Sequence, residues 1–121
     1  MQEDSSNINK GNKGEDLACI YLKKNGFRIV DRNIRTPFGE IDIIAKKKDF
    51  FHCFEVKSRN TMTFGSPFEA VTINKQTRIR QAAEYYFTYK NKTEARCLFG
   101  VIGVELSNNP PTIECMIDAF T

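Results

Sequence analysis

The chain has 121 residues, of which 40% are hydrophobic and 27% charged, and its formal net charge is +3. This length predicts one globular domain that buries about two-thirds of the surface its unfolded chain would expose. No apolar run approaches the roughly 18 residues of a membrane span, and residues 1–6 are polar and acidic rather than a signal peptide, so we expect a cytoplasmic protein with no membrane partner.

The cysteines and the single histidine do not form a zinc or triad pattern. His52 falls by strand alternation on the same side as Phe54, which favours simple packing over a ligand role. No C-x-x-C pair is present, which excludes the common zinc clusters and redox motifs. The cysteines, which we expect to be buried reduced thiols, are Cys19, Cys53, Cys97 and Cys115.

The first predicted element is a helix over residues 12–25. We expect residues 1–9 to be a disordered lead and residues 10–121 to form the domain. Apolar residues recur at helical spacing from Leu17 to Leu22, and Gly26 is a natural stop after the last turn. Glu15 lies at the rim of this stripe near the helix start, where a carboxylate complements the helix dipole.

A strand over residues 27–34 then leads into a predicted hairpin, which is the most informative part of the sequence. Residues 40–45 and 50–57 are rich in β-branched and aromatic residues and flank a polar turn. A turn centred between Lys48 and Asp49 sets the partners Glu40 with Lys57, Ile41 with Val56, Asp42 with Glu55, and Ile43 with Phe54. The charged side chains then share one face, while Ile41, Ile43, Phe54 and Val56 share the other.

Asp42 directly opposite Glu55 is unfavourable unless a cation lies between them. Carboxylate oxygens suit Mg²⁺, and Lys57 on the same face would position a water or neutralise charge on a phosphate, which together indicate phosphodiester hydrolysis. The alternative is a solvated polar face of an amphipathic hairpin. Ile44 and Cys53 share the charged face, which favours a cleft over an open surface.

A second helix and two strands follow. Residues 66–69 read as a capping box, and a helix with an apolar stripe is expected over residues 73–89 after a break near Thr72. Lys75, Gln76 and Arg78 crowd its early turns, either as phosphate ligands or as a solvated helix face. Residues 96–106 form a nearly continuous apolar run typical of a strand buried on both faces, and residues 112–120 alternate as a last antiparallel strand.

These motifs together resemble a known family. Asp42 followed by Glu55-Val56-Lys57 resembles the PD-(D/E)xK nuclease signature. The strings GEIDIIA and FEVKSR, with GNKGEDLACIYLKKNGF before them and FGSPFEAV after them, resemble the YraN family of endonuclease-like proteins over residues 11–106. Two positions depart from the pattern: Ile41 replaces the proline of the signature, and Gly100 stands where an aspartate is usual.

The resemblance implies a restriction-endonuclease-like α/β fold, with three α/β/α layers, a central mixed five-stranded sheet and two main helices, similar to Holliday junction resolvases. It implies Mg²⁺ or Mn²⁺ as cofactor, with Asp42, Glu55 and Glu15 at the metal and Lys57 as the catalytic lysine. The expected activity is endonucleolytic cleavage of DNA, including branched DNA, by a protein that works as a homodimer. The basic and polar residues expected to contact nucleic acid are Arg35, Arg59, Lys75, Gln76 and Arg78.

Two other functions remain open at this point. A catalytically inactive nucleic-acid-binding protein would keep the fold and lose cleavage, and the missing acid at Gly100 favours it. An assembly protein would use the apolar edge of its sheet, and its interface would be insensitive to salt, unlike contacts to phosphate.

Overall fold

The computed structural model describes residues 2–60, 71–92 and 94–120, with side chains from Lys13 onward. Its elements, in chain order, are α1 (Gln2–Lys24), β1 (Arg28–Arg35), β2 (Glu40–Lys47), β3 (Phe50–Arg59), α2 (Ile73–Tyr89), β4 (Cys97–Glu105) and β5 (Thr112–Phe120). The predicted α/β class, with a five-stranded mixed sheet and two helices, is confirmed. The capping box expected at residues 66–69 lies outside the described residues.

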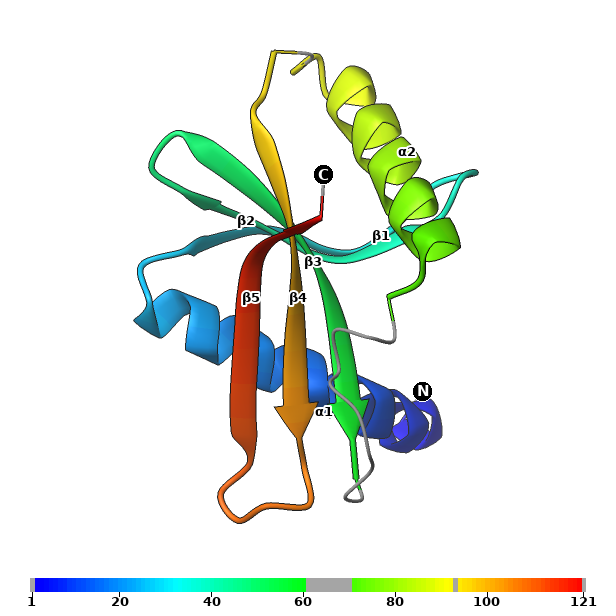
Figure 1. Ribbon diagram of the computed structural model, residues 1–121. Helices are drawn as coiled ribbons and strands as arrows, with labels where there is room; N and C mark the ends of the chain where they lie inside the picture. The colour runs from blue at the N-terminus through cyan, green and yellow to red at the C-terminus, as the bar shows by residue number, and fades with distance from the viewer. Residues whose placement is uncertain (1, 61–70, 93, 121) are drawn as a thin grey trace.

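The sheet has the strand order β1-β2-β3-β4-β5, so every strand lies beside its neighbour in sequence. All pairs are antiparallel except β3 with β4, which are parallel and joined through α2. The two helices lie on opposite faces of this sheet (Figure 1). The antiparallel hairpin β2–β3 therefore lies near the middle of the sheet, with a helix on each side of it.

Helix α1 covers one face through a small, closely packed contact. Ala18 and Leu22 are fully buried against Ile43 and Phe54 of the hairpin. A side chain at Gly14 would overlap the Ser58 side chain, so glycine allows the helix to approach β3 closely. The helix ends as predicted, because Gly26 has a φ of 89° and the chain turns there toward β1.

Helix α2 covers the other face. Its start is capped by Thr72, whose Oγ1 accepts a hydrogen bond from the Lys75 backbone N–H at 3.3 Å. The predicted apolar stripe is confirmed: the buried residues of this helix are Ile79, Ala82, Ala83, Tyr86 and Phe87. All of them except Ile79 pack on Ile44 and Cys53, the two apolar residues that the sequence places on the same face as the acids, whereas Ile79 packs with Val71 and Val101. That face is therefore covered rather than open.

The predicted hairpin register is confirmed from the turn as far as Ile43 opposite Phe54. The prediction is wrong beyond that point, because the three further pairs involving residues 40, 41 and 42 are not formed. Along the other edge of β2, Glu40 and Ile41 still pair with Arg35 and Ile34 of β1. Ile41 packs in the α2-side cluster, whereas Ile43, Phe54 and Val56 pack on the α1 side as expected. Strands β2 and β3 thus part at Asp42.

Helix α1 begins at Gln2, whereas the sequence predicts a disordered lead over residues 1–9 and a helix from residue 12. Hydrophobic periodicity reports only a buried face, and the first ten residues carry no apolar stripe that would have marked them as helical. In the parts of the chain that the structure describes, neither helix is both long and apolar enough to span a membrane.

The packing interpretation of His52 is confirmed. Its ring is 6% exposed and lies edge-on to Phe27 at 4.9 Å and stacked on Phe54 at 5.8 Å, measured between ring centroids. The cysteines are free thiols, of which Cys19 and Cys53 are buried while Cys97 and Cys115 are only half-buried. The Sγ atoms of Cys53 and Cys97 lie 3.0 Å apart, across β3 and β4.

Candidate active site

The site begins where β2 and β3 separate after their last pair, Ile43 with Phe54, and we call this point the fork. After the last hairpin pair, the Asp42 carboxylate takes the place of a backbone acceptor: its Oδ2 accepts a hydrogen bond from the Val56 N–H at 2.7 Å. The Val56 N–H has no backbone partner on β2 beyond the last pair, so the carboxylate accepts its hydrogen bond and is held in place by it. Glu55, the residue before Val56, has a side chain that is 14% exposed. The two predicted acids are therefore held at the same fork.

A cavity of about 360 Å³ opens beside this fork. Its walls come from the start of β2, from β3 and from the first turns of α2, and it is lined by Gly39, Glu40, Asp42, Glu55, Lys75, Arg78 and Ile79. Gly39 keeps the cavity narrow, because a Cβ there would lie 3.1 Å from the Arg78 Cβ and 3.3 Å from the Arg78 carbonyl oxygen. Glycine at this position thus lets the loop before β2 approach α2 closely, and a larger residue would push the two apart by a few tenths of an ångström.

Two lysines converge on Glu55. The Nζ atoms of Lys57 and Lys75 each lie 3.5 Å from Glu55 Oε2. Burial, together with the neighbouring Lys75, lowers the pKa of Lys57. An ammonium group with a lowered pKa gives up or takes up a proton closer to neutral pH than an ordinary lysine does. Asp42, Glu55 and Lys75 thus line the cavity, whereas Lys57 is not among its lining residues and lies beside it through its contact with Glu55.

The ionised form of Asp42 is disfavoured in the metal-free protein. Burial raises its pKa to about 7 and the nearby Glu55 adds to the effect, although the hydrogen bond from Val56 opposes it. A cation beside Asp42 would favour the ionised form. Two carboxylates in a polar cavity are a donor set that suits Mg²⁺ or Mn²⁺, which are commonly held by one or two carboxylates with waters and phosphate oxygens. The residues present at the fork therefore fit a divalent metal.

Glu15 lies close to the fork but is engaged elsewhere. Its Oε1 is 3.5 Å from Arg32 Nη2, and the same guanidinium contacts Asp16 at 2.8 Å. Burial raises the pKa of Glu15 although Arg32 lowers it, and its charge also raises the pKa of Asp42. No group of three or more His, Cys, Asp or Glu side chains within the described ranges is arranged to hold a metal. The expected set of Asp42, Glu55 and Glu15 is therefore not assembled as three ligands.

The residues expected to contact nucleic acid separate into two groups. Lys75 and Arg78 line the cavity. The other three make contacts within the protein. Gln76 Nε2 donates a hydrogen bond to the Val71 carbonyl oxygen at 3.2 Å. The Arg35 guanidinium lies 3.8 Å from the Glu40 carboxylate. The Arg59 guanidinium lies 3.7 Å from the Glu105 carboxylate, at the C-terminal ends of β3 and β4. Glu40, which the sequence places on the charged face with Asp42 and Glu55, also lines the cavity, whereas sequence reasoning missed Gly39 and Ile79, because only the docking of α2 brings them there.

Gly100, which stands where an aspartate is usual in the resembled family, lies away from the cavity. Gly100 pairs with Phe54 in the parallel ladder, and a Cβ there would lie 2.6 Å from Phe54 Cε1 and 2.7 Å from the Met116 carbonyl oxygen. Phe54 belongs to the α1-side core, whereas the cavity is walled by α2. A side chain at position 100 would therefore enter the packed core, so in this chain the glycine does not remove a ligand from the fork.

Comparisons with known proteins identify the family. The model of the "Uncharacterised protein family UPF0102" matches residues 14–104. The chain is similar to a UPF0102 protein of Rhodococcus jostii (43% identity, covering 94% of this chain and 98% of the relative) and to one of Dictyoglomus thermophilum (41%, covering 91% and 95%). A UPF0102 protein of Clostridium acetobutylicum is 45% identical over 84% of each chain. The fork, its acids and α2 lie largely within the matched region, and the chain belongs to the UPF0102 family.

Proposed function

We propose that this protein is a metal-dependent endonuclease that hydrolyses phosphodiester bonds in DNA, with branched or otherwise structured DNA as its substrate. The observation that supports this best is the meeting of Asp42, Glu55 and Lys57 at the fork between β2 and β3. It fits the resemblance of these residues to the PD-(D/E)xK signature. The preference for branched DNA and the expectation of a homodimer rest on that resemblance alone.

In this proposal Asp42 and Glu55 hold Mg²⁺ or Mn²⁺. When bound, the ion would polarise a phosphoryl oxygen and lower the pKa of a coordinated water. Glu15 would act from a distance through its charge, which an ion pair with Arg32 at 3.5 Å partly compensates. The hydrogen bond from Val56 would fix one Asp42 oxygen and leave the other for the cavity.

The amines supply the remaining chemistry. Lys57, with its lowered pKa, would hold the attacking water in line with the scissile bond and exchange a proton with it. Lys75 and Arg78 line the cavity from α2 and would neutralise the charge that develops on the phosphate. These roles are supported by the 3.5 Å distances from the Lys57 and Lys75 amines to Glu55 Oε2 and by the position of Lys75 and Arg78 in the cavity wall.

The experiment that tests this proposal is a cleavage assay with labelled linear and branched DNA in Mg²⁺ or Mn²⁺. We expect metal-dependent product from the native protein and none from Asp42→Asn, while Glu114→Gln on β5, an exposed carboxylate outside the site, cleaves normally. DNA binding without product at any metal concentration would instead support the inactive nucleic-acid-binding protein. Absence of both binding and cleavage would contradict both candidates.

A further inference from the structure

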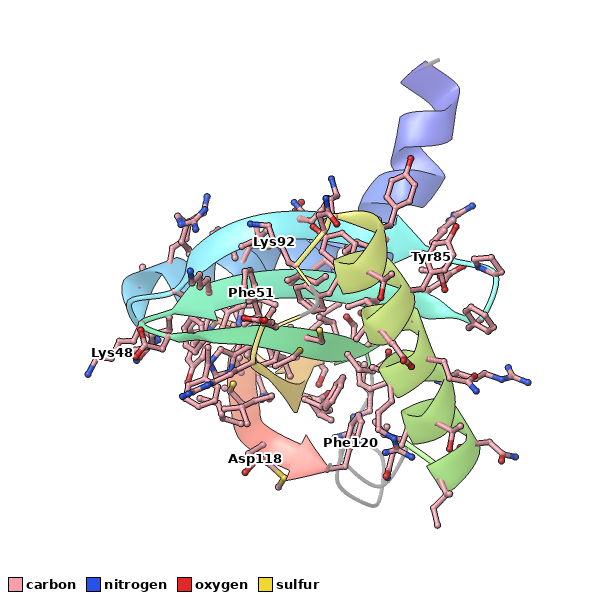
Figure 2. All side chains as sticks on the ribbon, turned by 90° about the horizontal axis from the view of Figure 1, so that it is seen from above. Lys48, Phe51, Tyr85, Lys92, Asp118 and Phe120 are labelled. Atoms are coloured by element: carbon pink, nitrogen blue, oxygen red, sulfur yellow. The ribbon has the colours of Figure 1, made fainter. Side chains whose placement is uncertain are left out.

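Three exposed aromatic side chains lie together beside the candidate active site. Phe38, Tyr85 and Tyr89 are 48%, 41% and 78% exposed. Phe38 comes from the loop between β1 and β2, and the tyrosines lie one helical turn apart on α2. Figure 2 shows Tyr85 on the side of α2 that faces this loop. We call these three residues the aromatic patch.

The rings of the patch contact one another. The centroids of Phe38 and Tyr85 are 5.9 Å apart with planes at 64°, and those of Tyr85 and Tyr89 are 6.3 Å apart with nearly parallel planes, at 4°. Two hollows meet at the patch, one of about 440 Å³ between Phe38 and α2 and one of about 310 Å³ on the side of β1. The patch therefore offers aromatic faces within concave surface, which suits a flat aromatic ligand.

The patch is continuous with the candidate active site. Phe38 lines the larger hollow, and the next residue, Gly39, lines the cavity that holds Asp42 and Glu55. On α2 the tyrosines of the patch lie about 10–17 Å along the helix axis from Arg78, another lining residue of that cavity. A strand with a phosphate at the fork would thus bring a base a few nucleotides away to the aromatic patch.

The charge around the patch suits a phosphate backbone. Arg35 and Lys90 line the smaller hollow, and the Arg35 side chain is 83% exposed. Arg78 lines the adjoining cavity. Glu84 also lines the larger hollow, so the positive charge beside the patch is concentrated on the side toward β1. Aromatic faces flanked by basic side chains are the combination with which proteins bind single-stranded nucleic acid without sequence preference.

We propose that the aromatic patch stacks unpaired nucleobases within a few nucleotides of the scissile phosphate, so that the substrate is DNA with a single-stranded segment beside the cut site, such as a flap or a gap, rather than continuous duplex. This inference rests on the proposed nuclease function and specifies its substrate. Fully paired bases are already stacked on their neighbours and present no free face to Tyr85 or Tyr89.

The absence of tryptophan from the sequence provides a direct probe. A Tyr89→Trp variant carries one tryptophan in the patch, and Ile117→Trp carries one at a position on β5 that is 46% exposed. In EDTA, where cleavage is blocked, single-stranded oligothymidylate should quench the fluorescence of Tyr89→Trp and leave Ile117→Trp unchanged. Equal quenching of both, or of neither, would overturn the inference.

Affinity measurements give a second, independent readout. Fluorescence anisotropy in EDTA should show that Tyr85→Ala/Tyr89→Ala binds flapped and single-stranded DNA at least about 10-fold more weakly, with continuous duplex little affected and with Ile117→Ala as the matched control. The slope of affinity against salt should stay unchanged, because stacking releases no counterions, whereas Arg35→Ala/Lys90→Ala should reduce it. Unchanged affinity of the tyrosine variant for flapped DNA would contradict the inference.

These results separate this inference from the proposed function. Metal-dependent cleavage with no role for the tyrosines would leave the nuclease proposal standing and overturn the stacking role. Stacking without any cleavage would support the patch and contradict the nuclease. Sedimentation of the same variants decides the remaining case: a tyrosine variant that loses self-association and keeps DNA affinity would make the patch an interface between copies of this chain, which also overturns the inference.

Discussion

The carboxylate of Asp42 accepts the backbone N–H of Val56 at 2.7 Å, in the place where a backbone carbonyl of β2 would stand if the hairpin continued. The same side chain thus ends the β2–β3 ladder and forms part of the cavity wall. Asp42 therefore has a structural role at the end of the ladder and a proposed role in metal binding, and the two can be measured separately.

The stability of the metal-free protein should depend on pH through Asp42. Its pKa rises from 3.8 to about 7 on folding, so the folded state holds this proton more tightly than the unfolded chain. The resulting stabilisation is complete below about pH 4 and is lost as the pH rises through 7. Asp42→Asn keeps an acceptor for Val56 and should therefore be more stable than the native protein at pH 8, by up to about 4 kcal/mol.

Urea unfolding in EDTA at pH 5 and at pH 8 measures this effect as the difference between the two proteins at each pH. Glu114→Gln, an exposed carboxylate on β5, serves as the matched control. A difference between Asp42→Asn and native protein that is the same at both pH values would show that Asp42 titrates as an ordinary carboxylate.

Lys57 should matter for cleavage and little for binding. Its amine lies 3.5 Å from Glu55 and belongs to the fork, so Lys57→Ala should lower single-turnover cleavage by about 100-fold or more. Affinity for the same DNA in EDTA should change less than 3-fold, as for Lys48→Ala in the exposed hairpin turn. If cleavage and affinity fall together by the same factor, Lys57 is only a binding residue.

Glu15 should contribute less than Asp42. Because Arg32 already compensates its carboxylate at 3.5 Å, Glu15→Gln should lower the cleavage rate by less than 10-fold, while Asp42→Asn abolishes it. The comparison requires saturating Mn²⁺, so that a weakened metal affinity does not appear as a lost rate. Complete loss in Glu15→Gln under these conditions would make it a direct ligand and contradict the arrangement described above.

A side chain at Gly100 should be costly and should not add activity. A Cβ there would lie 2.6 Å from a ring carbon of Phe54, so Gly100→Ala should destabilise the protein by about 1–3 kcal/mol in chemical unfolding. Gly100→Asp should be less stable still and should cleave no faster than the native protein. Faster cleavage by Gly100→Asp would show that position 100 faces the site after all.

Much of the fold around the fork could be predicted, because it follows from the local spacing of apolar residues. The stripe of α2 and the register from the hairpin turn to Ile43 and Phe54 follow from apolar positions that recur every three to four residues or every second residue. The burial of the acidic face was also predicted, because strand alternation places the apolar residues Ile44 and Cys53 on the same face as Asp42 and Glu55.

The end of the hairpin ladder could not be predicted in this way. Alternation assumes that pairing continues, and nothing local marks Ile43 with Phe54 as the last pair, after which Ile41 no longer faces Val56. The engagement of Arg35 and Arg59 with acids was missed for a related reason, because Glu40 and Glu105 become their neighbours only through sheet pairing. The cavity itself depends on where α2 docks, which periodicity does not specify.

Calorimetric titration with Mn²⁺ or Mg²⁺ shows whether Asp42 and Glu55 together hold one divalent cation, as we propose. We expect one site per chain in the native protein, weakened at least about 100-fold in Asp42→Asn and in Glu55→Gln, and unchanged in Glu114→Gln. Native protein that binds neither ion, or fork variants that bind as tightly as the native protein, would contradict this proposal.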